Sequence, residues 1–439
     1  MTQKFIALVA VLTLSSALSD LNAQSGAQTA TPLTLQQAEQ IAMKNHPRVF
    51  AAQYNALAAT QVVREARSSY FPTLQADVTG SVADHNTRLG AGYLSSSQLF
   101  NRFGQGISLD QLITDFGRTS NLVASSRFQA QAASDDAQAT RYDVLLAVNQ
   151  SYFEVLRSQA LLKVAQTTVS ERQVVLDQVS AMVQNKLKSE LDLSFAQVNL
   201  AQANLFQIRA QNNIKIAQAE LARAMGQQNP EAYTLAEQPL PSPPPETADP
   251  LVAQAMQNRP EILSAQASRD SAYKFQRAER DLSLPTVVAE GDAGVIPLVA
   301  QLTLPRLIPD HYEAAAVNIQ VPIFNGHLFA ARRQAALMRA RAADEGLRDT
   351  QGRVARDVRT AWANAVTNYQ QIDVATKLLN QAKLALALAQ GRYNLGLSSI
   401  VELSQAQLNE TEAEIQEVNA RYDFENQNAV LQYQVGLLR

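Results

Sequence analysis

LKSELDLSFAQ, the stretch from Leu187 to Gln197, recurs 210 positions later as LSSIVELSQAQ, from Leu397 to Gln407. The duplication extends outward from this pair, because NHPRVFAAQ at Asn45 recurs as NRPEILSAQ at Asn258, 213 positions further on. Repeats on this scale indicate two copies of one architectural unit. The segment PLPSPPPETADP, from Pro239 to Pro250, lies between the copies, and its prolines favour an extended linker.

Each copy carries a heptad pattern that runs far beyond the length of an ordinary helix. Apolar residues recur every seven positions from Val148 to Val183, and the positions 210 further on continue the pattern to Tyr393. This spacing is typical of a coiled-coil seam. No proline interrupts residues 121–186 or 331–396, so each range can form one helix of about 66 residues, roughly 100 Å long. A turn follows each helix, with Gly396 free to adopt positive φ in the second, and the sequence predicts two antiparallel helical hairpins.

Between the first helix of each copy and its hairpin, the hydrophobic pattern has a period of two residues, as in β-strands. The strand pairs are expected at about 73–113 and about 286–324, with strands of about 10 residues that can cross a bilayer when tilted. A soluble sheet packed on a helix would also alternate. The acids on the polar face, the long connections at one end and the aromatic residues at the strand ends favour an outer-membrane barrel. The expected lumen residues are Gln75, Asp77, Asp110, Glu290, Asp292, Asn318 and Gln320.

Four strands are too few to close a barrel, since the smallest known barrels have about eight. An open sheet edge within lipid would leave backbone amides without hydrogen-bond partners. We therefore expect the barrel to be shared between several chains.

Composition excludes several classes of function. The chain of 439 residues has 37 Lys and Arg against 40 Asp and Glu, so it lacks the basic excess of a nucleic-acid-binding protein. It has no cysteine, which excludes thiolate catalysis, cysteine-ligated metals and a lipidated cysteine anchor. Its four histidines show no metal-ligand spacing, and no convergent catalytic set is present. We expect no enzyme activity and no metal or cofactor.

The N-terminus has the order of a secretory signal: Lys4, an apolar stretch to Leu14, then small residues up to Ala23. We expect a signal peptide at residues 1–23 and a flexible segment at 24–32. The first repeat is expected at 33–226 with its hairpin at about 118–226, the proline-rich linker at 227–250, and the second repeat at 251–439 with its hairpin at about 328–437.

Together these features resemble the TolC-like outer-membrane efflux protein family over essentially the whole mature chain. The resemblance rests on the duplicated NHP and NRP segments, on QLITDFGR at Gln111 and VPIFNGH at Val321, and on RYNLGLSSIVELSQAQ from Arg392 to Gln407. It implies a mainly α fold with a transmembrane β part: a homotrimer in which four strands per chain build a 12-stranded β-barrel and the hairpins form an α-barrel tunnel.

The resemblance also implies a function and partners. Such proteins are passive exit ducts in the outer membrane, which serve tripartite efflux or type I secretion systems. They lie in outer-membrane lipid and dock onto a periplasmic adaptor and an inner-membrane pump of the RND, ABC or MFS type. The alternative is a periplasmic coiled-coil adaptor or structural envelope protein, for which we would expect one hairpin flanked by small soluble β-domains.

In the family, acidic residues after the second hairpin turn ring the periplasmic entrance, and a polar latch holds neighbouring hairpins together. Glu402 matches the first ring position, whereas Gln405 stands at the second, so one charged ring is expected instead of two. Asp192 and Tyr393 match latch positions, and Ser398 replaces a latch arginine, which favours a weaker closed state.

A structural interpretation of the same tip residues is also open. Ser189–Asp192 and Ser399–Glu402 both fit a capping box, in which the two side chains satisfy free amides at a helix start. Capping is favoured over gating for Asp192, the two are evenly balanced for Glu402, and both roles can coexist.

Overall fold

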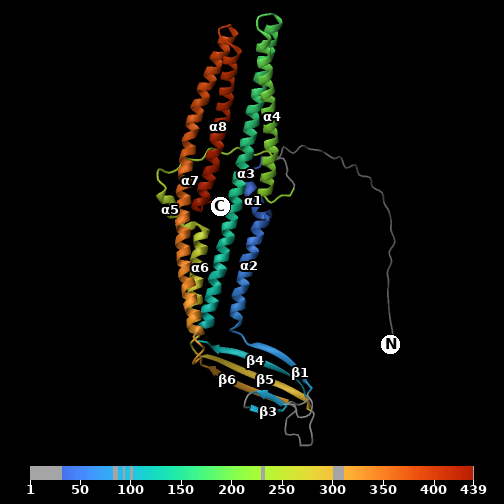
Figure 1. Ribbon diagram of the computed structural model, residues 1–439, viewed down its shortest axis with the longest axis vertical. Coiled ribbons are helices and arrows are strands. Elements are labelled where there is room, and N and C mark those ends of the chain that lie inside the picture. Colours follow the sequence, from blue (N-terminus) through green and yellow to red (C-terminus); the bar gives the residue numbers. More distant parts are fainter. Residues whose placement is uncertain are drawn as a thin grey trace, which may run out of the picture.

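The computed structural model describes residues 32–82, 88–91, 94–98, 102–228, 233–299 and 311–438. The expected signal peptide lies outside the described residues, as does nearly all of the expected flexible segment. The molecule is elongated, with two helical hairpins at one end and a sheet at the other (Figure 1). Among the described helices, none combines the length and apolar character needed to cross a membrane.

Two long helices run through the molecule. Helix α3 spans Arg118–Gln184 and α7 spans Leu328–Asn394, each 67 residues long. The chain returns in α4 (Glu190–Ala224) and α8 (Ile400–Val435). Alanines at every seventh position fill the seams, which lets the paired helices approach closely: Ala196, Ala203, Ala210 and Ala217 in α4, and Ala375, Ala382 and Ala389 in α7. The two predicted hairpins are therefore present.

The shorter helix at the start of each copy is broken in two, where the sequence predicted one. Helices α1 (Leu35–Asn45) and α2 (Pro47–Ser68) meet at His46, and α5 (Asp249–Asn258) and α6 (Pro260–Asp281) meet at Arg259. His46 and Arg259 both have extended backbone. The cause is the following proline, which disfavours the helical region for the residue before it and can only begin a new helix.

The main sheet has four antiparallel strands in the order β1-β4-β5-β6. They are β1 (Thr73–Ser81), β4 (Arg102–Thr114), β5 (Thr286–Val299) and β6 (His311–Gln320). Strands β4 and β5 come from different repeats, so their pairing joins the two copies. β2 (Arg88–Ala91) and β3 (Leu94–Gln98) form a separate small hairpin that the sequence did not reveal. Strand β6 ends at Gln320, four residues earlier than expected.

The helices lie side by side in a helical layer that extends away from one end of the sheet and does not cover its faces (Figure 1). Near the sheet, α3 contacts α2 and α6, and α6 contacts α7; further away, α3 contacts α4 and α8. At mid-height a core cluster surrounds Tyr152, whose hydroxyl lies 2.8 Å from the carbonyl oxygen of Leu33 and 2.6 Å from that of Ala236 and shares its one proton between them. This core fastens the start of the first repeat and the linker to α3.

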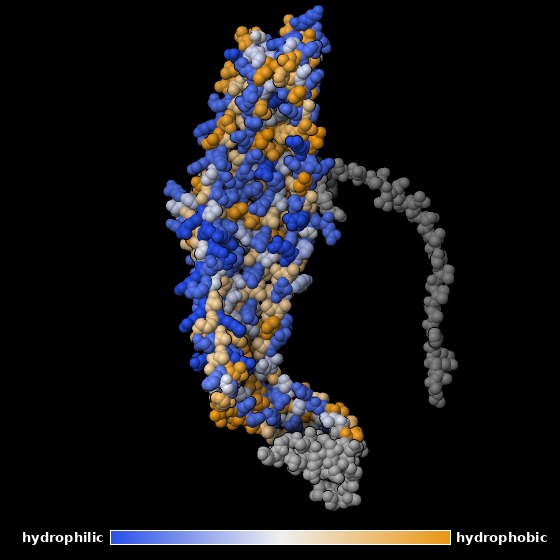
Figure 2. Space-filling model, in the orientation of Figure 1, coloured by the Kyte–Doolittle hydropathy of each residue, from blue (hydrophilic) through white to orange (hydrophobic). Residues whose placement is uncertain are grey.

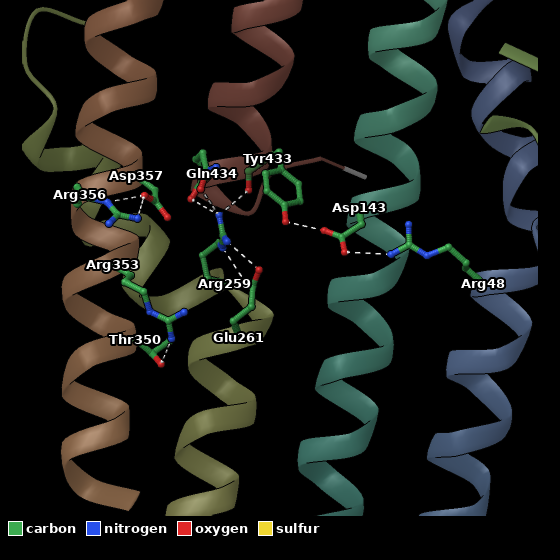
Figure 3. A network of polar contacts seen from close by, with 10 residues as sticks. All are labelled: Arg48, Asp143, Arg259, Glu261, Thr350, Arg353, Arg356, Asp357, Tyr433 and Gln434. Carbon is green, nitrogen blue, oxygen red and sulfur yellow. Dashed lines mark hydrogen bonds and ion pairs between the residues drawn. The ribbon is translucent and has the colours of Figure 1, made fainter. Parts of the chain in front are cut away.

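A polar network ties the two repeats together beside this core (Figure 3). The Tyr433 hydroxyl on α8 donates to Asp143 on α3 at 2.6 Å. Arg259 donates to the side-chain oxygen of Gln434 at 2.6 Å and to its carbonyl at 3.3 Å, which caps the end of α8. Arg259 is also paired with Glu261 at 2.7 Å. Buried and fully paired, this arginine fixes α6 against α8.

Candidate functional site

The candidate site lies at the hairpin tips, furthest from the sheet (Figure 1). In the first hairpin, Ser189 and Asp192 form a complete capping box. The Asp192 amide donates to the Ser189 hydroxyl at 3.3 Å, and the Asp192 carboxylate accepts from the Ser189 amide at 3.0 Å. Lys186 in the preceding turn has φ +60°. The capping interpretation of Asp192 is confirmed.

In the second hairpin only half of the expected capping box forms. The Glu402 amide donates to the Ser399 hydroxyl at 3.3 Å, but the Glu402 carboxylate pairs with Arg392 Nε at 3.3 Å, across the turn. Gly396 has φ +77° at the position equivalent to Lys186, 210 residues earlier. The Ser398 hydroxyl is buried and has no hydrogen-bond partner among the described residues.

Tyr393 joins the two tips. It is 3% exposed within the tip cluster, whose other buried members are Val175, Val179, Ala196, Ile400 and Leu403. The ammonium of Lys188, from the first hairpin, lies 4.1 Å from the centre of the Tyr393 ring. Burial and then the nearby Asp192 carboxylate raise the pKa of the Tyr393 hydroxyl. Asp192 and Tyr393, the two expected latch residues, are therefore brought together, whereas Glu402 is held on the Arg392 side of its own turn.

Below the tip cluster lies a charge cluster that the sequence interpretation missed, formed by Glu171, Arg172, Lys383, Glu410 and Glu414; Arg172 and Glu410 are its buried members. Arg172 on α3 is 6% exposed and donates through Nη2 to the Gln407 carbonyl at 2.8 Å and to Thr411 at 3.0 Å, both on α8. Glu410 is 5% exposed. Lys383 on α7 pairs with Glu414 at 3.2 Å.

Burial and two nearby carboxylates perturb the protonation of this cluster. Burial, and then the charges of Glu414 and Glu171, raise the pKa of Glu410 to about 7. Burial lowers the pKa of Arg172. The signal in the sequence was Arg172 itself, which occupies the heptad position filled by Ala382 in the second copy.

Gln405, the expected second ring position, is exposed and donates to Asn409 at 2.8 Å on its own helix. Among the described residues, Gln405 makes no hydrogen bond to the tip cluster or to Glu402.

Polar and apolar residues of the four-stranded sheet lie mainly on opposite faces. Directly paired residues share a face, and the register pairs Gln75 with Ser108, Ser108 with Asp292, and Asp110 with Glu290. By this register, all seven expected lumen residues lie on one face. The opposite face is mostly apolar and exposed; it includes Leu74, Val78, Ile107, Val317 and Ile319, with Gln105 and Glu313 among them.

Exposed aromatic residues lie where the helices meet the sheet: Tyr70, Phe71, Phe116 and Phe324. Apolar surface gathers at this junction in Figure 2. This arrangement matches the interfacial belts of membrane proteins.

Long hairpins and a two-faced four-stranded sheet define the class of outer-membrane duct proteins. The model of the outer membrane efflux protein family matches residues 13–227 and 251–436, and the chain belongs to this family. It is 22% identical to the outer membrane protein TolC of Salmonella enteritidis over 419 residues, 92% of this chain and 82% of that protein. It is 26% identical to the solvent efflux pump outer membrane protein SrpC of Pseudomonas putida, over 83% of this chain and 77% of that protein.

A solved structure of CusC has the same fold, with a TM-score of 0.79, 19% identity and 92% of each chain covered. The fold class predicted from the sequence is confirmed, and so is the outer-membrane location with the helical tunnel in the periplasm. The chain is an outer-membrane exit duct of an efflux system, and the alternative of a periplasmic adaptor is set aside.

Proposed function

We propose that the chain acts as a homotrimer that passively conducts substrates handed over by a periplasmic adaptor and an inner-membrane pump. The observation that supports this proposal is the four-stranded sheet with its two open edges and its exposed, mostly apolar face. Strands β1 and β6 are its edges, and its apolar face is exposed along the length of the strands. Edges within lipid require partner strands, and two further copies of the chain supply them. The polar face then lines the barrel, with Asp77, Asp110, Glu290 and Asp292 toward the lumen.

We further propose that the hairpin tips close the periplasmic entrance at rest. Tyr393 and Lys188 hold the two hairpins of one chain together at the tip. Glu402 of three chains would form one acidic ring at the narrowest point, and negative charge there would favour cations. The pairing of Glu402 with Arg392 reduces the net charge of this ring.

The ring is tested by Glu402→Ala in planar-bilayer recordings of the purified trimer. We expect a lower cation-to-anion permeability ratio, because the variant removes the carboxylate and leaves Arg392 unpaired. Glu412→Ala, an exposed acid on the same helix, removes the same charge and should leave the ratio unchanged. Equal ratios for the wild type and Glu402→Ala would refute the ring.

The latch is tested by Tyr393→Ser in the same recordings. Truncation of a buried aromatic side chain costs about 3–5 kcal/mol of local packing, so we expect more frequent openings at rest. Tyr369→Ser, on the same helix but 39% exposed, is the matched control and should open less. A Tyr393→Ser trimer with wild-type closed times would contradict a latch at this position.

A further inference from the structure

A cavity of about 500 Å³ lies between α3, α6 and α7 in the half of the helical layer nearer the sheet. Its walls include Phe128, Arg269, Tyr273, Lys274, Arg277 and Asp344, and we call it the basic pocket. It is far from the tips, none of its lining residues belongs to the sheet, and the duct function gives it no role.

The lining of the basic pocket carries three cations, Arg269, Lys274 and Arg277, against two carboxylates, Asp270 and Asp344, an excess of one positive charge. Arg269 is paired with Asp270 at 2.7 Å, and Asp344 accepts a hydrogen bond from the Tyr273 hydroxyl. Lys274 and Arg277 make no ion pair or hydrogen bond within the described part of the chain. Two cations therefore face the pocket with their hydrogen-bond donors free for an anion.

The pocket lies on the face of the layer that the linker covers. Arg341 on α7 lies near the pocket, because its charge acts on the Tyr273 hydroxyl. Arg359 follows Arg341 by 18 residues, which make about five full helical turns. Arg359 therefore shares this face of α7, and it contacts Asp249 of α5 at 3.5 Å.

Asp344 of the pocket is likewise 18 residues before Trp362, which donates to the Pro245 carbonyl of the linker at 2.8 Å. A duct has to keep its lumen clear, so the face covered by the linker and α5 is the outer one. The basic pocket consequently opens on the outside of the tunnel.

The height of the pocket matches the lipid headgroups. Arg277 precedes the end of α6 at Asp281 by four residues, or about 6 Å, and Lys274 by about 10 Å. The exposed aromatic belt at the junction marks the edge of the membrane, and the polar headgroup layer beyond the hydrocarbon is about 5–7 Å thick. Arg277 thus lies at the depth of the lipid phosphates, and Lys274 lies just above it.

The charges along α7 change with distance from the sheet. Its first 16 residues, 328–343, contain four arginines and no acid. Further from the sheet each of the next three arginines has an acidic partner within its own helix: Arg348 with Glu345, Arg353 with Asp349 and Arg356 with Asp357, the last pair visible in Figure 3. Unneutralised positive charge is therefore concentrated near the membrane, where anionic lipids attract it.

We propose that the basic pocket binds the phosphate headgroup of an anionic phospholipid in the periplasmic leaflet of the outer membrane. Lys274 and Arg277 supply the charge and the donors, while Phe128 and Tyr273 provide apolar surface for the glycerol portion. This proposal rests on the orientation given by the proposed barrel, but it does not depend on the gate at the tips.

The test uses the full-length trimer reconstituted in nanodiscs of phosphatidylethanolamine, phosphatidylglycerol and cardiolipin, with retained lipid measured by native mass spectrometry. We expect anionic lipid to be enriched over phosphatidylethanolamine. The double variant Lys274→Gln/Arg277→Gln should weaken that enrichment by about twentyfold, a few-fold for each charge removed. The control Arg348→Gln/Arg353→Gln removes the same charge further up, and should retain the wild-type enrichment.

Two outcomes would overturn the lipid site: equal enrichment in the double variant and the wild type, or complete displacement of the lipid by millimolar inorganic phosphate, which would indicate a site for free phosphate. Single-channel conductance is measured on the same purified trimers in planar bilayers. An unchanged conductance of the open channel together with lost enrichment supports the lipid site with the duct intact. A wild-type trimer that shows no openings at all would count against the proposed duct and leave the lipid site untouched.

Discussion

Replacing Arg172 with methionine is expected to raise the open-to-closed ratio of the resting duct by about a hundredfold. Arg172 connects α3 to α8 through its bonds to Gln407 and Thr411, directly below the tip cluster. Removing one partner of a buried charged network costs about 3 kcal/mol or more, because the remaining charges stay buried without compensation. That free energy is lost from the arrangement in which the two hairpins touch, and about 1.4 kcal/mol corresponds to a factor of ten.

The matched control is Arg157→Met. Arg157 also joins α3 to α8, through Asp423 at 3.2 Å, but its side chain is 29% exposed and its partner 47% exposed. A solvated pair of this kind contributes about 0–1 kcal/mol, so its loss should change the ratio by a few-fold at most. The open-to-closed ratio of both variants is measured from their open probability in planar-bilayer recordings. Similar ratios for Arg172→Met and Arg157→Met would show that burial of Arg172 does not hold the tip.

The second large effect concerns pH. Five charged groups lie close to one another in the charge cluster below the tips: Glu171 and Arg172 on α3, Lys383 on α7, and Glu410 and Glu414 on α8. Burial, then Glu414 and Glu171, raise the pKa of Glu410 to about 7 from its ordinary value near 4.5. The closed arrangement therefore keeps a proton that an opened, hydrated Glu410 would lose.

The sign of the pH effect follows from this difference. Below about pH 4.5 Glu410 is protonated in both arrangements, and the closed one has its full stability. As the pH rises toward 7, only the opened arrangement gains by releasing the proton, so the closed arrangement loses stability. We expect open probability to increase between about pH 4.5 and 7 and to level off above that range.

Glu410→Gln provides the decisive comparison, because glutamine keeps the shape of the protonated acid and cannot titrate. The variant should stay mostly closed and lose the dependence on pH in this window. Glu412→Gln, an exposed neighbour, should keep the wild-type profile. A profile in Glu410→Gln that still rises from pH 5 to 7 would assign the titration to another group.

Local sequence patterns predicted most of the helices and strands of this fold. The heptad from Val148 to Val183 and its copy predicted both long helices to within a few residues of their bounds, because a seam needs the same residue types at every turn. Alternation predicted four of the strands and placed Asp77 and Glu290 on a common face, since a period of two fixes the side of a sheet.

Contacts between distant positions were not predictable in the same way. Arg172 and Gln407 are 235 residues apart, and a lone arginine in a seam does not reveal what it binds. The pairing of Glu402 with Arg392 required the geometry of the turn, because S-x-x-E alone fits a capping box equally well. The break at His46 could have been predicted, since Pro47 follows it directly.

The equal lengths of α3 and α7, 67 residues each, limit how the gene can change. One inserted residue lengthens a helix by about 1.5 Å and rotates everything beyond it by about 100°. An insertion in one repeat alone would therefore make the tips uneven and turn the seam away from its partner. Insertions or deletions that preserve function should therefore be multiples of seven residues, with a matching change in each return helix and in both repeats. The two repeats are thus constrained to change in length together.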